Sequence, residues 1–82
     1  MSENSKPDIN KVRSALTPHL RNRVAIGDDT PLISGGLIDS MSLVELIMDL
    51  EAAFQVRIPA SEVQPDDFDS VRKIAAVIER FR

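Results

Sequence analysis

The apolar residues of this 82-residue chain recur at intervals of three and four positions, a spacing that places them on one face of an α-helix. Residues 9–16, 40–54 and 70–80 each show this period, and it is clearest in the second. Asp8 is placed to cap the first of these helices or to favour its start, and Ser70 is a plausible N-cap of the last. Pro18 disfavours helical geometry at the residue before it, so the first helix is expected to end near Leu16 or Thr17.

Two shorter segments lie between the second and last periodic stretches. Residues 59–63 can form one or two helical turns, with Pro59 near the first position and Pro65 expected to interrupt them. Residues 55–58 alternate between polar and apolar, but four residues are too few to build a sheet without a partner strand. The pattern therefore predicts an all-α fold, a small four-helix bundle with a short third helix.

Residues 21–39 show no sustained period and contain the turn-forming stretches Gly27–Pro31 and Ser34–Gly36. Loops longer than about 12–15 residues are uncommon in small domains and are often functional. Apolar side chains are expected to pin this loop between the first two helices onto the core: Val24, Ile26, Leu32, Ile33, Leu37 and Ile38.

Length and cysteine content limit the kind of protein that the chain can be. Eighty-two residues allow one domain, residues 1–82, with a net stability of roughly 5 kcal/mol and a flexible N-terminus over residues 1–7. The absence of cysteine excludes disulfides and thiolate metal sites, so packing alone must hold the fold. No apolar run approaches the roughly 18 residues of a membrane helix, and the N-terminus lacks a signal-peptide core. We therefore expect a soluble, cytoplasmic protein.

The formal net charge of −3 conceals a segregation of charge along the chain. Residues 28–70 carry ten acidic side chains and one basic side chain, Arg57, whereas residues 1–27 and 71–82 each carry a net charge of +3. Such an acidic block repels nucleic acid and attracts basic protein surfaces, although it can also be a solvated face without a partner.

Most enzyme classes require groups that this chain does not supply. The single histidine, His19, has no cysteine or second histidine for a metal site and is expected to be an ordinary surface or packing residue. Gly35 and Gly36 are too few for a phosphate-binding loop, and no Lys-Ser or Lys-Thr follows them. The adjacent acids at 28–29 and 66–67 are best explained by turn and capping roles.

The remaining constellation is Ser40, at the junction of the long loop and the strongest helix. Local physics offers a structural explanation, because Asp39 and Ser40 are both favoured N-caps and Ser42 with Glu45 matches a capping box. A functional serine there would be exposed, held at a rigid helix start, and close to backbone N–H groups that suit a phosphate. Both explanations remain open at this point.

The run Gly36-Leu37-Ile38-Asp39-Ser40-Met41-Ser42-Leu43-Val44-Glu45-Leu46 resembles the acyl and peptidyl carrier proteins. The resemblance extends from Asp29-Thr30-Pro31-Leu32 to Phe54 and Ile58-Pro59, which is most of the chain. It implies a four-helix bundle without catalysis of its own. The Ser40 hydroxyl would be joined to 4'-phosphopantetheine by a separate phosphopantetheinyl transferase that uses coenzyme A, and the arm's thiol would carry the cargo as a thioester.

The resemblance also implies partners: the transferase, an acyl- or aminoacyl-loading ligase, and downstream acyltransferases or synthases. Family partners recognise the second helix through acidic and apolar residues, which here are Asp39, Met41, Val44, Glu45 and Met48. We expect transient contacts steered by charge and no nucleic-acid or membrane partner. An accessible second helix also favours a monomer.

Departures from the fatty-acid-synthesis pattern leave the cargo open. Met41 stands where leucine is usual, and the uncharged Ala52 and Ala53 lie in a stretch that is often acidic. Residues 65–67 lengthen the segment before the last helix. The Gly-Leu-Ile-Asp-Ser form is similar to that of stand-alone carriers of amino acids, D-alanine or specialised metabolites. Two further alternatives are an unmodified helical interaction module, with Ser40 only a cap, and catalysis by Ser40 with a base brought close in space.

Overall fold

The computed structural model describes residues 9–21 and 25–82, and these residues form three α-helices, four 3₁₀ turns and no strand. The helices are α1 (Ile9–Leu16), α2 (Leu43–Phe54) and α3 (Val71–Phe81). The 3₁₀ turns are η1 (Thr17–His19), η2 (Ser40–Ser42), η3 (Ala60–Glu62) and η4 (Pro65–Phe68). The flexible N-terminus, the Asp8 helix start and the Val24 contact predicted from the sequence lie outside the described residues.

The all-α class is confirmed, but the short third helix of the predicted four-helix bundle is not. The segment predicted at residues 59–63 forms a single 3₁₀ turn, η3. Pro65 begins a second turn, η4, and does not interrupt the first. Proline is well suited to a first helical position because its missing N–H would have no partner there. Gln64 and Asp67 complete this turn with a reciprocal capping box.

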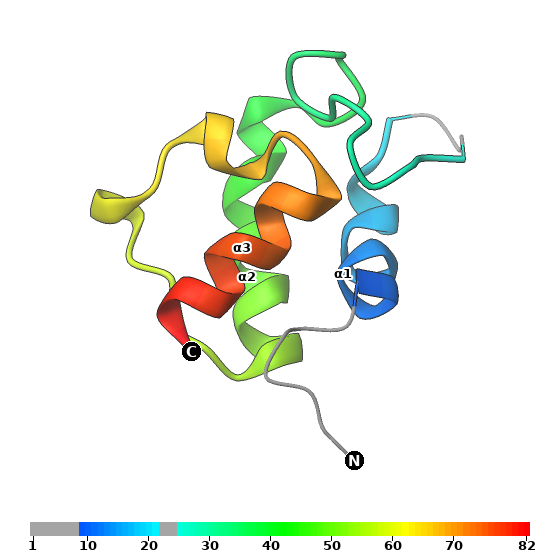
Figure 1. Ribbon diagram of the computed structural model, residues 1–82. Helices are drawn as coiled ribbons and strands as arrows, with labels where there is room; N and C mark the ends of the chain where they lie inside the picture. Colours follow the sequence, from blue (N-terminus) through cyan, green and yellow to red (C-terminus); the bar gives the residue numbers. More distant parts are fainter. Residues whose placement is uncertain (1–8, 22–24) are drawn as a thin grey trace.

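The end of α1 agrees with the sequence. The helix ends at Leu16, and Pro18 lies inside the 3₁₀ turn η1. Helix α1 packs against both α2 and α3, and η4 packs against α3 (Figure 1). The loop that includes residues 25–39 closes one end of the molecule between α1 and α2 (Figure 1).

The core combines one face of each helix with side chains from the loop and from η4. Leu32 and Ile38 of the loop are fully buried, as predicted, while Ile26, Ile33 and Leu37 are partly buried against the core. Phe68 of η4 is the largest fully buried side chain. The buried apolar residues are Val12, Leu16, Leu32, Ile38, Leu43, Leu46, Leu50, Ile58, Phe68, Val71, Ile74, Ala75, Val77 and Ile78.

Candidate functional site

Asp39 and Ser40 mark the point where the loop becomes helix. Asp39 has an extended backbone (φ −71°, ψ 138°), and its Oδ1 accepts a hydrogen bond of 3.1 Å from the Met41 backbone N–H. Ser40 then begins η2, which leads directly into α2. Asp39 is therefore the N-cap of the helical segment that contains Ser40.

The predicted capping box of Ser42 and Glu45 is wrong. Ser42 already has helical geometry (φ −80°, ψ −8°) and makes no side-chain cap hydrogen bond. Helical geometry begins three residues earlier than a cap at Ser42 requires, because the 3₁₀ turn precedes the α-helix. The capping role falls to Asp39, and Ser40 is not the cap.

Ser40 is exposed, and its hydroxyl makes no hydrogen bond to the residues that the structure describes. It lies within one turn of the N-terminal end of α2, where the helix dipole favours a negatively charged group. An accessible hydroxyl on an ordered backbone can accept a phosphate-linked group without disturbing the core. The site therefore fits a covalent phosphodiester, and Asp39 fits a role in holding the turn.

The partner of His19 is Asp49 of α2. Its Nε2 lies 2.7 Å from Asp49 Oδ2, and the imidazole is largely buried, so it links η1 to α2. Asp49 lies nine positions beyond Ser40, about 13 Å along a helix of 1.5 Å rise per residue. His19 is thus a packing residue with Asp49 as its side-chain partner, and the structure does not bring it to Ser40 as a base.

The two adjacent glycines shape the loop that leads into Ser40. Gly36 has a positive φ of 77°, and its N–H donates to Ile33 O at 3.1 Å. A Cβ on Gly35 would collide with the backbone carbonyl of Pro31. These glycines are therefore required by a tight turn.

The exposed face of α2 and η2 carries the large apolar side chains predicted to meet partners. Met41, Val44 and Met48 expose 83%, 64% and 61% of their surface, and Glu45 is exposed beside them. Among residues 9–21 and 25–82, Asp39 and Glu45 form no ion pair. This face is therefore acidic with exposed apolar side chains.

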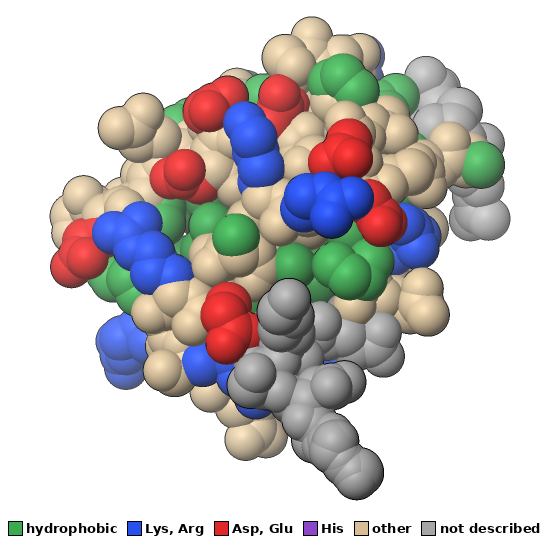
Figure 2. Space-filling view, in the orientation of Figure 1, with side chains coloured by type: hydrophobic (Ala, Val, Ile, Leu, Met, Phe, Trp, Pro, Cys, Tyr) green, Lys and Arg blue, Asp and Glu red, His purple; other side chains and the backbone are tan. Residues whose placement is uncertain are grey.

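Much of the remaining acidic block is paired with basic residues of the two chain ends. Asp28 contacts Arg13, Asp29 Oδ1 lies 2.8 Å from Arg72 Nε, and Asp66 Oδ2 lies 3.3 Å from Lys73 Nζ. The hydrogen bond from Arg72 holds the pKa of Asp29 below its ordinary value. Acidic and basic groups are intermixed on the face shown in Figure 2. The sequence count alone did not reveal this pairing, because two of these three pairs join residues 15 and 43 positions apart along the chain.

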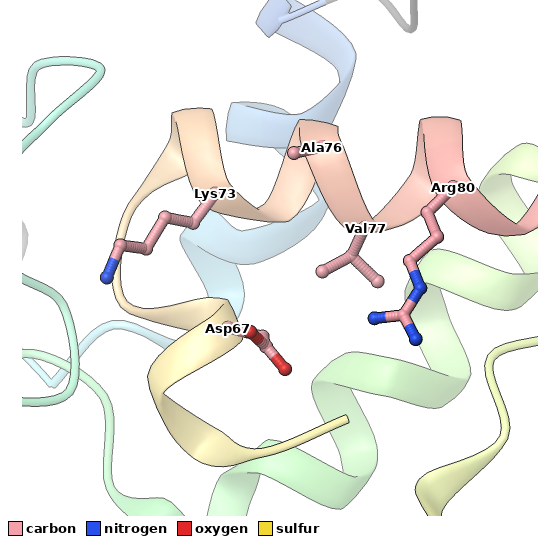
Figure 3. Close-up of a pocket in the computed structure, with 5 residues that line it drawn as sticks. All are labelled: Asp67, Lys73, Ala76, Val77 and Arg80. Carbon is pink, nitrogen blue, oxygen red and sulfur yellow. The ribbon is translucent and has the colours of Figure 1, made fainter. Parts of the chain in front are cut away.

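A shallow groove lies between η4 and α3, and Ser40 does not line it. Val77 points into it between Lys73 and Arg80, with Asp67 opposite (Figure 3). Lys73 pairs with Asp66, and Arg80 Nη2 lies 3.8 Å from Glu62 Oε1. Both cations of the groove are thus engaged by neighbouring carboxylates, and none of the lining residues belongs to the Ser40 site.

Comparison with known proteins identifies the class that this fold and site define. Residues 11–78 match the family model described as a phosphopantetheine attachment site. The chain belongs to this family of carrier domains, and its cofactor is covalently bound 4'-phosphopantetheine. The resemblance stated from the sequence is therefore confirmed.

Curated proteins that are similar to this chain are named D-alanyl carrier proteins. The chain is 41% identical over 54 residues to the D-alanyl carrier protein of Streptococcus thermophilus (strain ATCC BAA-491 / LMD-9), covering 66% of this chain and 68% of that protein. It is 41% identical over 51 residues to the D-alanyl carrier protein of Leuconostoc citreum (strain KM20), covering 62% and 65%. It is 39% identical over 54 residues to that of Streptococcus pyogenes serotype M1, covering 66% and 68%. In the described part of the chain, no helix is long and apolar enough to cross a membrane.

Proposed function

We propose that the protein is an aminoacyl carrier whose Ser40 holds the phosphopantetheine arm. The observation that carries the proposal is the exposed Ser40 hydroxyl at the start of the η2–α2 segment, directly after a capping aspartate. The family match supplies the cofactor, and Ser40 offers it an accessible oxygen on an ordered turn. Asp39 supports this turn through its hydrogen bond to the Met41 N–H.

The chemistry at Ser40 is the formation of one phosphodiester bond. Ser40 Oγ attacks the pyrophosphate of coenzyme A, 3',5'-adenosine bisphosphate leaves, and a base of the transferase takes the hydroxyl proton. The arm, when attached, supplies a thiol that holds an acyl or aminoacyl group as a thioester. The protein's own residues supply the nucleophilic oxygen and a fixed backbone. They do not supply the base, because the only histidine, His19, is paired with Asp49. We therefore propose that the chain is a carrier without catalytic activity of its own.

An amino acid of the D-alanine class is the cargo that we propose, ahead of a fatty-acyl or polyketide group. The name of the relatives, D-alanyl carrier protein, supports this choice. The proposed partners are a phosphopantetheinyl transferase, an ATP-dependent aminoacyl ligase and a downstream acyltransferase. Met41, Val44, Glu45 and Met48 form the surface that we propose for their docking. A cytoplasmic monomer that binds no nucleic acid is the state that we expect for such a carrier.

The attachment is tested by intact mass spectrometry after incubation with coenzyme A, Mg²⁺ and a broad-specificity phosphopantetheinyl transferase. The wild-type protein should gain one phosphopantetheine, and Ser40→Ala should gain none while keeping its helical circular dichroism spectrum. Ser42→Ala is the matched control and should be modified like the wild type. A folded Ser40→Ala protein that is still modified would exclude Ser40. A wild-type protein that no transferase modifies would favour an unmodified interaction module.

The cargo is tested on the modified protein with an aminoacyl ligase, ATP and D-alanine. The expected result is a second mass increase equal to one alanyl group, which hydroxylamine removes because it cleaves thioesters. A fatty-acyl ligase with a long-chain fatty acid serves as the comparison and should load poorly. Efficient fatty-acyl loading together with no alanyl loading would contradict the aminoacyl assignment.

A further inference from the structure

Asp69 lies between η4 and α3, and its side-chain hydrogen bonds all run to the loop that leads into Ser40. Its Oδ1 accepts from the backbone N–H groups of Ile33 at 2.6 Å and Ser34 at 2.8 Å. Its Oδ2 accepts from the Ser34 hydroxyl at 2.7 Å, and its backbone carbonyl accepts from Leu32 N at 2.7 Å. One residue thus fixes three consecutive positions of a loop more than thirty residues away in sequence.

The loop transmits this anchoring toward the site through its own hydrogen bonds. The backbone N–H groups of Leu37 and Ile38 both donate to Leu32 O, at 2.8 and 2.9 Å. Leu32 and Ile38 are also fully buried, so both ends of this hydrogen-bonded turn are held by the core. Ile38 directly precedes the Asp39–Ser40 pair. Asp69 therefore acts on the backbone two residues before the attachment oxygen.

N-capping of α3 does not account for the Asp69 carboxylate. Ser70 already caps α3, because its Oγ accepts from Lys73 N at 3.1 Å. Burial alone would raise the pKa of Asp69, but the hydrogen bonds from Ser34 and Ile33 outweigh it and hold the pKa below its ordinary value. The side chain is thus an ionised acceptor, and hydrogen bonds to a charged group are about twice as strong as neutral ones.

We infer that Asp69 is a positioning residue for the modification of Ser40, acting through residues 32–38. This inference rests on the proposed function, because it takes Ser40 as the attachment residue. A transferase must bind the loop end and the first turn of α2 in one arrangement. Loosening the loop lowers the fraction of molecules in that arrangement, and the apparent affinity falls by the same factor.

The test compares Asp69→Asn with Asp66→Asn, a matched control that removes the same charge three residues away without touching the loop. Transferase kinetics are measured at saturating coenzyme A, below the unfolding temperature of every variant. For Asp69→Asn we expect the KM for the carrier to rise about three- to ten-fold with kcat within about two-fold, as weakened preorganisation requires. Asp66→Asn should match the wild type. A wild-type KM in folded Asp69→Asn would overturn the inference.

Hydrogen exchange separates positioning from a general loss of stability. In Asp69→Asn the amides of Ile33 and Ser34, and those of Ser40 and Met41, should exchange faster, while the amides of α3 keep wild-type rates. Uniformly faster exchange with an unchanged KM would overturn the inference.

Ser34→Ala keeps the test decisive if Asp69→Asn does not fold. Ser34 is exposed, so its substitution removes one hydrogen bond to Asp69 without opening a cavity. We expect a smaller rise in KM, about two-fold, again without a change in kcat. No change in KM for Ser34→Ala would count against the inference. If the wild-type protein is not modified at Ser40, the proposed function fails. If the wild-type protein is modified at Ser40 and the variants have its KM, the inference about Asp69 fails and the proposed function stands.

Discussion

At the scale of single residues, the site depends on a capping bond that holds the turn of Ser40. Asp39 is exposed, extended and bonded to the Met41 N–H, whereas Ser42 caps nothing. The sequence offered three favoured capping residues within four positions, Asp39, Ser40 and Ser42, and could not rank them, since all three satisfy the compositional rule. The choice depends on where helical geometry begins, and here a 3₁₀ turn moves that point to Ser40.

The cap can be tested by two substitutions of Asp39. Asp39→Ala removes the acceptor for the Met41 N–H and should lower the free energy of unfolding by about 1 kcal/mol. Asp39→Asn keeps an acceptor and should cost only a few tenths of a kcal/mol. Urea denaturation followed by circular dichroism measures both. Equal losses for the two variants would mean that the charge, and not the cap, supports this turn.

Other residue-level predictions depended on whether the partner was near in sequence. Ser70 was predicted as the N-cap of the last helix and is confirmed, because its partner Lys73 lies three residues away. The bond of Asp69 to Ile33 and the pairing of His19 with Asp49 were missed, since their partners lie 36 and 30 residues away. An aspartate just before a helix cap gives no local signal of a loop contact.

At the scale of elements, apolar periodicity predicted the three helices, but it did not predict the structure of the segment between α2 and α3. The stripes of α1, α2 and α3 bury enough apolar surface to define them from sequence. Residues 59–68 contain two prolines and few apolar side chains, so tertiary contacts decide their geometry. Phe68 enters the core, and the chain around it adopts two 3₁₀ turns in place of a helix.

The exposed face of α2 predicts a salt-sensitive docking reaction. Glu45→Lys reverses a charge in the first turn of α2, where no ion pair to the described residues engages it. Transferase kcat/KM should fall about ten-fold at low salt, and the loss should shrink as salt screens the interaction. Glu79→Lys makes the same charge change on α3 and is the control. Equal losses for the two variants would show that net charge, and not the α2 face, governs the reaction.

At the scale of the whole molecule, carboxylates hold the loop against α1 and α3. Some belong to the loop itself, and one belongs to Asp69. Asp28 and Asp29 pair with Arg13 and Arg72, and Asp69 reaches back to Ser34. The charge segregation seen in the sequence therefore serves the fold as well as the surface. The count of acidic residues indicated an attractive face for basic partners, but it could not tell paired carboxylates from free ones.

These ties predict a loss of stability in acid. The pKa values of Asp29 and Asp69 are lower in the folded protein than their ordinary value of 3.8. A carboxyl with a depressed folded pKa stabilises the fold fully above its unfolded value, and this contribution disappears as the pH falls through the folded value. The urea midpoint should therefore drop below about pH 4, and it should drop less steeply for Asp69→Asn. Parallel curves for the two proteins would contradict the assigned role of the Asp69 charge.

We propose that Ser40 carries the phosphopantetheine arm, and localising the arm within the modified protein is the sharpest test of this assignment. The transferase-treated protein is digested with trypsin, and the peptide spanning residues 24–57 is fragmented by tandem mass spectrometry. This peptide contains Ser34, Ser40 and Ser42, so fragment ions distinguish the candidates. We expect the phosphopantetheine on Ser40 alone. Modification of Ser34 or Ser42, or of a residue outside this peptide, would contradict it.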